Sequence, residues 1–133
     1  MPLTNQEQER YNRHIILHDI RIQGQEKIKA TSILVVGAGG LGSPILYYLT
    51  AAGIGHIGIM DDDVVSESNL PRQILYDTTH VGTPKVTVAT TKLQQLNPFT
   101  RIILPDYRWI TPSKLFPNTT LSWTLPIICT LAT

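Results

Sequence analysis

The chain has 133 residues, 42% of them hydrophobic and 16% charged, with a formal net charge of +1 and one cysteine. The length suits a single domain, the composition excludes a disordered chain, and the lone cysteine excludes a disulfide framework. The near-neutral charge gives no reason to expect nucleic acid as a partner. The polar N-terminus has no signal-peptide pattern and no apolar run could span a bilayer, so we expect a cytoplasmic protein with no membrane partner.

The first part of the sequence predicts helices, a buried strand and a glycine-rich turn. Residues 4–17 are expected to form a helix that begins with a capping box, and a short helical piece is expected at 25–29. The β-branched run at 32–36 predicts a buried strand. It leads directly into Gly-Ala-Gly-Gly-Leu-Gly at 37–42.

The alternation of helices and strands continues after this turn. We expect a helix at 43–52, a strand at 57–60, a helix that starts at Pro84 and ends before Asn97, and a strand at 101–104. The order predicts an α/β fold, a Rossmann-like parallel sheet with helices on both faces. The expected domain covers residues 1–116.

The glycine-rich turn has the features of a nucleotide site. Gly37, Gly39 and Gly42 match G-x-G-x-x-G between a strand and a helix, where backbone amides at the helix N-terminus meet a phosphate. Asp61 ends the next strand, where an acid commonly holds a ribose hydroxyl. An NAD-binding oxidoreductase fragment is therefore the first hypothesis. It leaves Arg72 and Lys85 unexplained, because further cations suit a triphosphate better than a dinucleotide.

Five motifs occur in the order that the ThiF/MoeB/HesA adenylyltransferases have them. They are Arg10-Tyr-Asn-Arg13, the glycine run at 37–42, Asp61-x-Asp63, Ser68-Asn-Leu-x-Arg-Gln73 and Gly82-x-Pro-Lys85. Over about residues 8–110 the chain thus resembles this family, the bacterial relatives of ubiquitin-activating enzymes.

The resemblance implies a site for ATP and Mg²⁺. The implied ATP-binding residues are Gly37, Gly39, Gly40, Gly42, Asp61, Ser68, Asn69, Arg72, Gln73 and Lys85. Asp61 would hold the ribose, while Arg72 and Lys85 would act on the phosphates as catalytic residues. Arg13 is the third implied catalytic residue, a finger that reaches into the neighbouring subunit's site of a homodimer.

The reaction that the resemblance implies is an adenylation. The C-terminal Gly-Gly carboxylate of a ubiquitin-like sulfur-carrier protein would attack the α-phosphate of ATP, and pyrophosphate would leave. The sequence does not distinguish thiamine from molybdopterin biosynthesis. A non-catalytic module that dimerises or binds a carrier protein is a further alternative.

No metal-binding residue is predicted in the chain. The four histidines have no ligand spacing, Asp62 is expected to be solvated, and Asp63 is expected to cap the following turn. Cys129 has no motif around it that would give it the role of the family's reactive cysteine. Relative to the family the chain is truncated, and its own activity is left open.

Residues 117–133 carry no charged side chain. The simplest interpretation is a final strand with a loose end. A shift of one base offers another, because Trp123 must be TGG and Thr124 must begin AC, so that their overlap, GAC, encodes aspartate. Neighbouring overlaps permit the Asp-x-Thr-Asp-Asn motif in which the family has its magnesium aspartate. We therefore hypothesise a one-base deletion near residues 116–118 and an out-of-frame tail.

A tail of this origin was not selected to pack, so residues from about 118 onward are expected to be irregular. A chain that ends at Pro117 should then melt at nearly the same temperature as the full chain. Unfolding of the domain by this deletion, detected by circular dichroism, would instead show that the tail is an integral strand.

Overall fold

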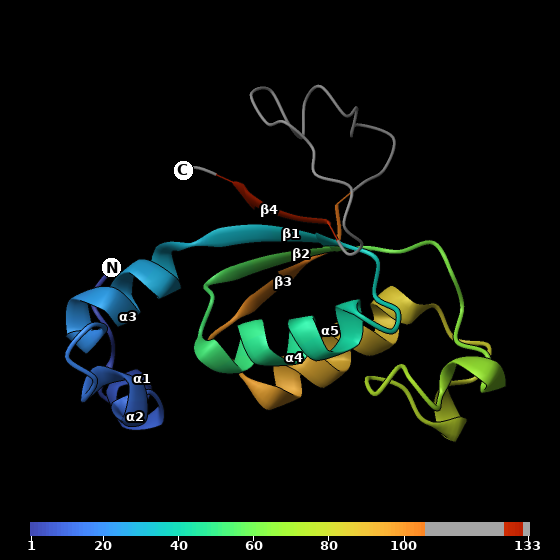
Figure 1. The fold of residues 1–133 in the computed structure, drawn as a ribbon, viewed down its shortest axis with the longest axis horizontal. Helices are drawn as coiled ribbons and strands as arrows, with labels where there is room; N and C mark the ends of the chain where they lie inside the picture. The colour runs from blue at the N-terminus through green and yellow to red at the C-terminus, as the bar shows by residue number, and fades with distance from the viewer. Residues whose placement is uncertain (106–126, 132–133) are drawn as a thin grey trace.

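The computed structural model describes residues 1–105 and 127–131, and its centre is a four-stranded sheet (Figure 1). The strands are β1 (Ser32–Val36), β2 (His56–Met60), β3 (Arg101–Ile103) and β4 (Ile127–Leu131), in the spatial order β3-β2-β1-β4. The first three strands are parallel, which confirms the predicted Rossmann-like fold.

The central strands are held by their buried apolar side chains. β1 and β2 pair along their whole length, from Ser32 opposite His56 to Val36 opposite Met60. Val35 and Ile57 are completely buried, and they join Leu46 and Leu93 from the helices in one core. Burial of this kind fixes the register, since a slip of one residue would turn the apolar side chains to the opposite face.

The helices α4 (Gly42–Ala52) and α5 (Lys85–Leu96) cover the same face of the sheet, as Figure 1 shows. We predicted helices on both faces, but in the described part of the chain both crossover helices lie on one. The reason is topological, because β1, β2 and β3 follow one another in one direction across the sheet. Two right-handed crossovers in the same direction place both helices on the same side.

The N-terminal segment contains more helices than the sequence predicted. The expected helix at 4–17 is divided into α1 (Asn5–Arg10) and α2 (Asn12–Ile15), and α3 (Arg21–Ala30) is longer than the piece expected at 25–29. The predicted capping box is present at the start of α1. The division falls at Tyr11, whose side chain is buried and whose backbone leaves the helical conformation.

A buried polar network holds this segment against the ends of α4 and α5. The Asn97 amide nitrogen donates to the Tyr11 hydroxyl and to the Thr50 carbonyl, both at 2.8 Å, and the side chain is completely buried. The Gln25 amide likewise donates to the carbonyl of Ala52 at 2.8 Å. These contacts satisfy carbonyls at the end of α4 that have no partner within the helix.

The tail forms a strand in its described part. The backbone of β4 pairs antiparallel with β1 over five residue pairs, so residues 127–131 form a regular strand. The out-of-frame origin of the tail stays a hypothesis. Residues 106–126 and 132–133, where the rest of the tail prediction falls, lie outside the described residues. None of the helices in the described ranges is long and apolar enough to cross a membrane.

Replacement of Asn97 by alanine tests the polar network. The change leaves the buried Tyr11 hydroxyl without a donor and removes one donor of the Thr50 carbonyl, which still accepts from the Gly53 amide. The free energy of unfolding should therefore fall by about 1–3 kcal/mol. Urea denaturation measures the difference. Gln94→Ala, at an exposed position of α5, the helix that Asn97 follows, is the matched control and should change stability little. Equal stability of the two variants would contradict the importance of the network.

Candidate nucleotide-binding site

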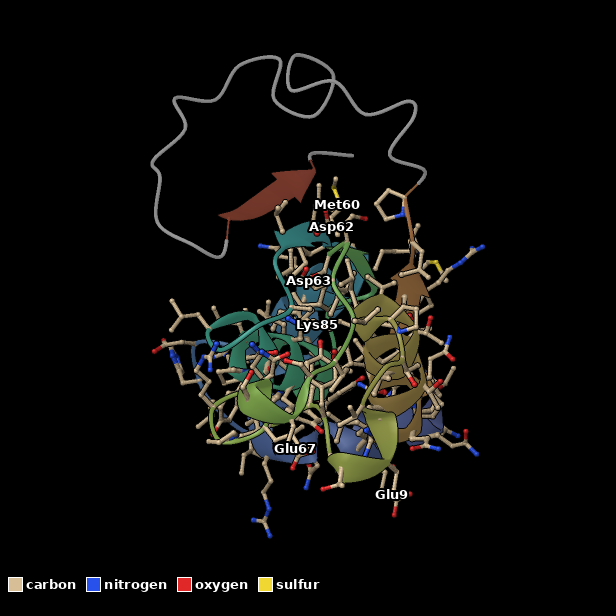
Figure 2. All side chains as sticks on the ribbon, turned by 90° about the vertical axis from the view of Figure 1, so that its right-hand side faces the viewer. Glu9, Met60, Asp62, Asp63, Glu67 and Lys85 are labelled. Atoms are coloured by element: carbon tan, nitrogen blue, oxygen red, sulfur yellow. The ribbon has the colours of Figure 1, made fainter. Side chains whose placement is uncertain are left out.

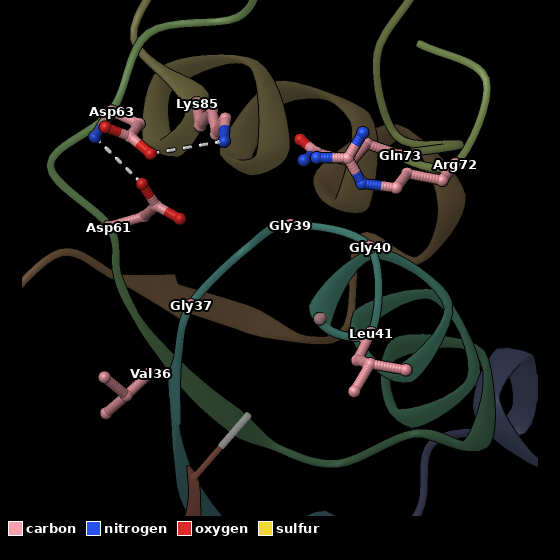
Figure 3. A pocket seen from close by; sticks show the side chains of 11 residues that line it. Val36, Gly37, Gly39, Gly40, Leu41, Asp61, Asp63, Arg72, Gln73 and Lys85 are labelled. Carbon is pink, nitrogen blue, oxygen red and sulfur yellow. Dashed lines mark hydrogen bonds and ion pairs between the residues drawn. The ribbon is translucent and has the colours of Figure 1, made fainter. Parts of the chain in front are cut away.

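A cavity of about 600 Å³ lies where β1 and β2 end (Figure 3). Four separate parts of the chain line it, namely the end of β1 with the turn into α4, the end of β2, the loop around Arg72, and the first residue of α5. The lining residues are Val36, Gly37, Gly39, Gly40, Leu41, Gly42, Asp61, Asp63, Arg72, Gln73 and Lys85. Ligands of open α/β sheets bind in this position, at the carboxyl ends of the strands.

The glycine turn is tight because two of its residues approach each other closely. Gly37 has a φ of 96°, which side chains other than glycine rarely adopt. A Cβ atom at Gly42 would lie 2.0 Å from the carbonyl oxygen of Gly37, so this position requires glycine. Within the described residues the amides of Gly39 and Gly40 donate no hydrogen bond. These amides are therefore available to an anion in the cavity.

Asp61 ties this turn to the end of β2. One carboxylate oxygen accepts a hydrogen bond from the Ala38 amide at 2.8 Å, and the other accepts from the Asp63 amide at 2.9 Å. Each carboxylate oxygen can accept more than one hydrogen bond. Asp61 can therefore keep the turn in place and still receive a hydroxyl group of a ligand.

Lys85 places a buried positive charge at the cavity. The residue is only 4% exposed, and its ammonium nitrogen lies 3.6 Å from a carboxylate oxygen of Asp63 (Figures 2 and 3). The backbone of Lys85 also donates to the Asp63 carbonyl at 3.0 Å. The sequence predicted that Asp63 caps a turn; the structure instead makes it the ion-pair partner of Lys85.

Arg72 and Gln73 reach the cavity from the opposite side (Figure 3). Arg72 is exposed, donates to the Ser68 carbonyl at 3.1 Å and lies beside Gly40. Gln73 is 4% exposed, and its side-chain oxygen has no hydrogen-bond partner in the described part of the chain. A buried acceptor without a donor is costly, so a ligand donor would be favoured at this point.

Three residues with predicted roles do not line the cavity. The Asn69 side chain accepts from the Ser66 amide at 3.0 Å, and the Ser68 hydroxyl lies 3.2 Å from that of Ser66. Both residues thus shape the loop that carries Arg72. Arg13 is exposed on α2, in the segment that precedes the amino end of β1, whereas the cavity lies at its carboxyl end.

Tyr76 belongs to the site although the sequence did not predict it. Its hydroxyl donates to the carbonyl of Ala38 at 2.6 Å, and the side chain is 5% exposed. Burial and the nearby charge of Asp61 raise the pKa of Tyr76 well above its usual range, so the hydroxyl keeps its proton. No periodic pattern distinguishes this tyrosine from a core residue, because only the fold brings it under the glycine turn.

The carboxylates of Asp61, Asp62 and Asp63 form a cluster in which one oxygen from each residue lies within 4.8 Å of the others. Oxygen ligands of this kind suit Mg²⁺. However, the Lys85 ammonium group already faces Asp63, and Asp62 is exposed, as predicted. The cluster therefore fits a resident metal ion poorly.

The ThiF family profile matches residues 11–123. The chain belongs to the ThiF family. It is 51% identical over 102 residues to a sulfur carrier protein adenylyltransferase of Thermus thermophilus, an alignment that covers 77% of this chain and 38% of that protein. It is 53% identical over 93 residues to a probable molybdopterin-synthase adenylyltransferase of Porphyra purpurea, with coverage of 70% and 24%.

Solved structures of the family share the fold. The ATP complex of the tRNA N6-threonylcarbamoyladenosine dehydratase TcdA from E. coli superposes with a TM-score of 0.73 and 28% identity, covering 88% of this chain and 47% of that protein. In the two alignments with adenylyltransferases, the matched part of the chain spans roughly a quarter to two-fifths of each relative's length. The family assignment made from the motifs is confirmed.

The closeness of Gly42 to Gly37 yields a prediction. Gly42→Ala places a methyl group against the Gly37 carbonyl oxygen, which cannot move without opening the turn, so the free energy of unfolding should fall by about 2 kcal/mol or more. In Gly40→Ala the nearest atoms belong to the Arg72 side chain at 3.6 Å, an ordinary contact. Denaturant unfolding should show this variant close to the unaltered chain. A Gly42→Ala protein of normal stability would refute the tight turn.

Proposed function

We propose that the cavity binds ATP and that the chain acts in the adenylation of the C-terminal Gly-Gly carboxylate of a ubiquitin-like sulfur-carrier protein. The observation that carries the proposal is the presence of two cationic side chains, Arg72 and Lys85, on a cavity that also offers the amides of a glycine turn. The glycine-turn amides suffice for the two phosphates of a dinucleotide. A triphosphate carries more negative charge, which can interact with both cationic side chains as well as with the amides.

Each side chain has a role in this proposal that its position supports. Asp61 accepts the ribose hydroxyls, and the amides of Gly39 and Gly40 meet the phosphates. The carrier carboxylate attacks the α-phosphorus, the bond from this phosphorus to the bridging oxygen breaks, and pyrophosphate leaves. Arg72 and Lys85 stabilise the negative charge that gathers on the leaving oxygens.

Ser68, Asn69 and Gln73 complete the proposed ATP site. Ser68 and Asn69 act through the loop, because their hydrogen bonds fix the backbone that holds Arg72. Gln73 offers its buried side-chain oxygen, which has no partner among the described residues, to a donor of the nucleotide. Magnesium would enter the site bound to the triphosphate, whose charge it would partly neutralise.

Arg13 is proposed to act in the site of a second copy of the chain, in a homodimer. Its exposure and its distance from its own cavity along the strand direction are both compatible with action in trans. Ile16 and Leu17, 63% and 51% exposed, follow it closely in the chain and offer apolar surface for such a contact.

A cytoplasmic location of the protein is likewise a prediction.

The carrier protein is proposed from the relatives. Both adenylyltransferases compared above are named for sulfur-carrier or molybdopterin-synthase substrates, and both are more than 50% identical over the matched residues. The dehydratase acts on tRNA by its title and is 28% identical. These relatives therefore favour a protein carrier as the substrate.

The choice between ATP and NAD is tested by thermal unfolding. ATP should raise the melting temperature more than NAD does at equal concentration, because only ATP has a third phosphate for Arg72 and Lys85. Saturation at a hundred times the dissociation constant adds about 2.7 kcal/mol of stability, which corresponds to a shift of several degrees. A larger shift with NAD would exclude the adenylyltransferase proposal and favour the oxidoreductase alternative.

Lys85→Met tests whether the Lys85 charge contributes to ATP binding, since methionine retains much of the buried side-chain volume. ATP should raise the melting temperature of this variant much less than that of the unaltered chain. Lys92→Met is the matched control, because Lys92 lies in the same helix and also pairs with an aspartate, Asp77 at 3.5 Å, away from the cavity. Its ATP shift should be normal; a loss in both variants would show that the effect is not specific to the site.

A further inference from the structure

The Ala38 backbone is held from two sides by residues of other segments. Its amide donates to Asp61 at 2.8 Å, and its carbonyl accepts the Tyr76 hydroxyl at 2.6 Å. Two successive peptide groups of the glycine turn are thereby fixed, the first by a residue at the end of β2 and the second by a residue of the loop that follows it. Tyr76 itself does not line the cavity and lies buried beneath the turn.

The second peptide group joins Ala38 to Gly39. Because a trans peptide is planar, its carbonyl and its N–H point in opposite directions. The hydroxyl that holds the Ala38 carbonyl therefore also sets the direction of the Gly39 N–H, away from Tyr76. Gly39 lines the cavity, and its amide donates no hydrogen bond in the described residues.

The Ala38–Gly39 peptide group needs a hydrogen bond from outside the turn to fix its orientation, because glycine contributes its N–H. A flip of the peptide would carry Gly39 to positive φ, which glycine adopts at little cost. Gly39 is not among the residues with positive φ in the structure, so the unflipped form is the one present. The protonated hydroxyl of Tyr76 supplies the donor that the flipped form would lose.

Tyr76 also connects the turn to the loop that carries the cation and the amide side chain. Its backbone amide donates to the carbonyl of Gln73 at 3.2 Å, and Gln73 packs against Gly39, 3.4 Å from the position that a Cβ would take there. Gln73 directly follows Arg72. Tyr76 thus forms hydrogen bonds with both the glycine turn, at Ala38, and the loop that carries Arg72, at Gln73.

We propose that Tyr76 is a positioning residue for phosphate binding, whose hydroxyl fixes the Ala38–Gly39 peptide with its N–H directed at the nucleotide. The inference rests on the proposed ATP site and adds a residue that makes no contact with the ligand. It requires that loss of the hydroxyl affects binding of the phosphates and leaves binding of the nucleoside unchanged.

Tyr76→Phe removes only the hydroxyl. Calorimetric titration of the full chain should show about five- to tenfold weaker binding of ATP, with the affinity for adenosine unchanged. Tyr11→Phe is the matched control, since it removes another buried tyrosine hydroxyl with a hydrogen-bonded partner, Asn97, remote from the cavity. It should bind ATP normally. Unchanged ATP affinity in Tyr76→Phe, or equal loss for ATP and adenosine, would overturn the inference.

A measurement on the unaltered chain covers the case in which Tyr76→Phe does not fold. In amide-resolved NMR the Gly39 N–H should move strongly downfield with ATP and should hardly move with adenosine. An unmoved Gly39 resonance in an ATP-bound protein would refute the positioning role and leave the proposed function standing. Failure of the unaltered chain to bind ATP would refute the proposed function, and the inference with it.

Discussion

The cavity depends on the contact of the glycine turn with itself, where Gly42 at the start of α4 lies against the Gly37 carbonyl at the end of β1. This contact brings the first turn of the helix next to the strand end. As a result, backbone amides that have no partner in a helix face the same space as the residues that follow β2. Side chains cannot take this position, so the chemistry of the site begins with backbone geometry.

Around this turn the fold assembles charge from segments that are distant in sequence. Asp61 comes from the end of β2, Arg72 from the loop after it, and Lys85 from the first residue of α5. The Lys85 ammonium group is buried and faces Asp63, which partly balances its charge. A buried cation with an exposed acidic partner can exchange that partner for phosphate at modest cost, since the acid can return to water.

The N-terminal helices form a second unit of structure at the other end of the sheet. Tyr11, Gln25 and Asn97 join them to the carbonyl ends of α4 and α5 through buried hydrogen bonds. Arg13 projects from this firmly held region and not from a loose arm, while the cavity lies at the opposite end of the strands. This separation is the structural basis for proposing that it acts on a second copy.

The sequence by itself determined the features that depend on local pattern. The strand at 32–36, the glycine turn, Asp61 and the helix that begins near Lys85 were all predictable, because β-branched runs, glycine spacing and proline position act over a few residues. Tertiary structure decided the rest. Crossovers between distant segments produce the pairing of Lys85 with Asp63, place the hydroxyl of Tyr76 under the turn, and put α4 and α5 on the same face of the sheet. Local sequence has no periodicity that could predict contacts between distant segments. The clearest example is the antiparallel pairing of β4 with β1, because the sequence could suggest a strand but not its neighbour or its direction.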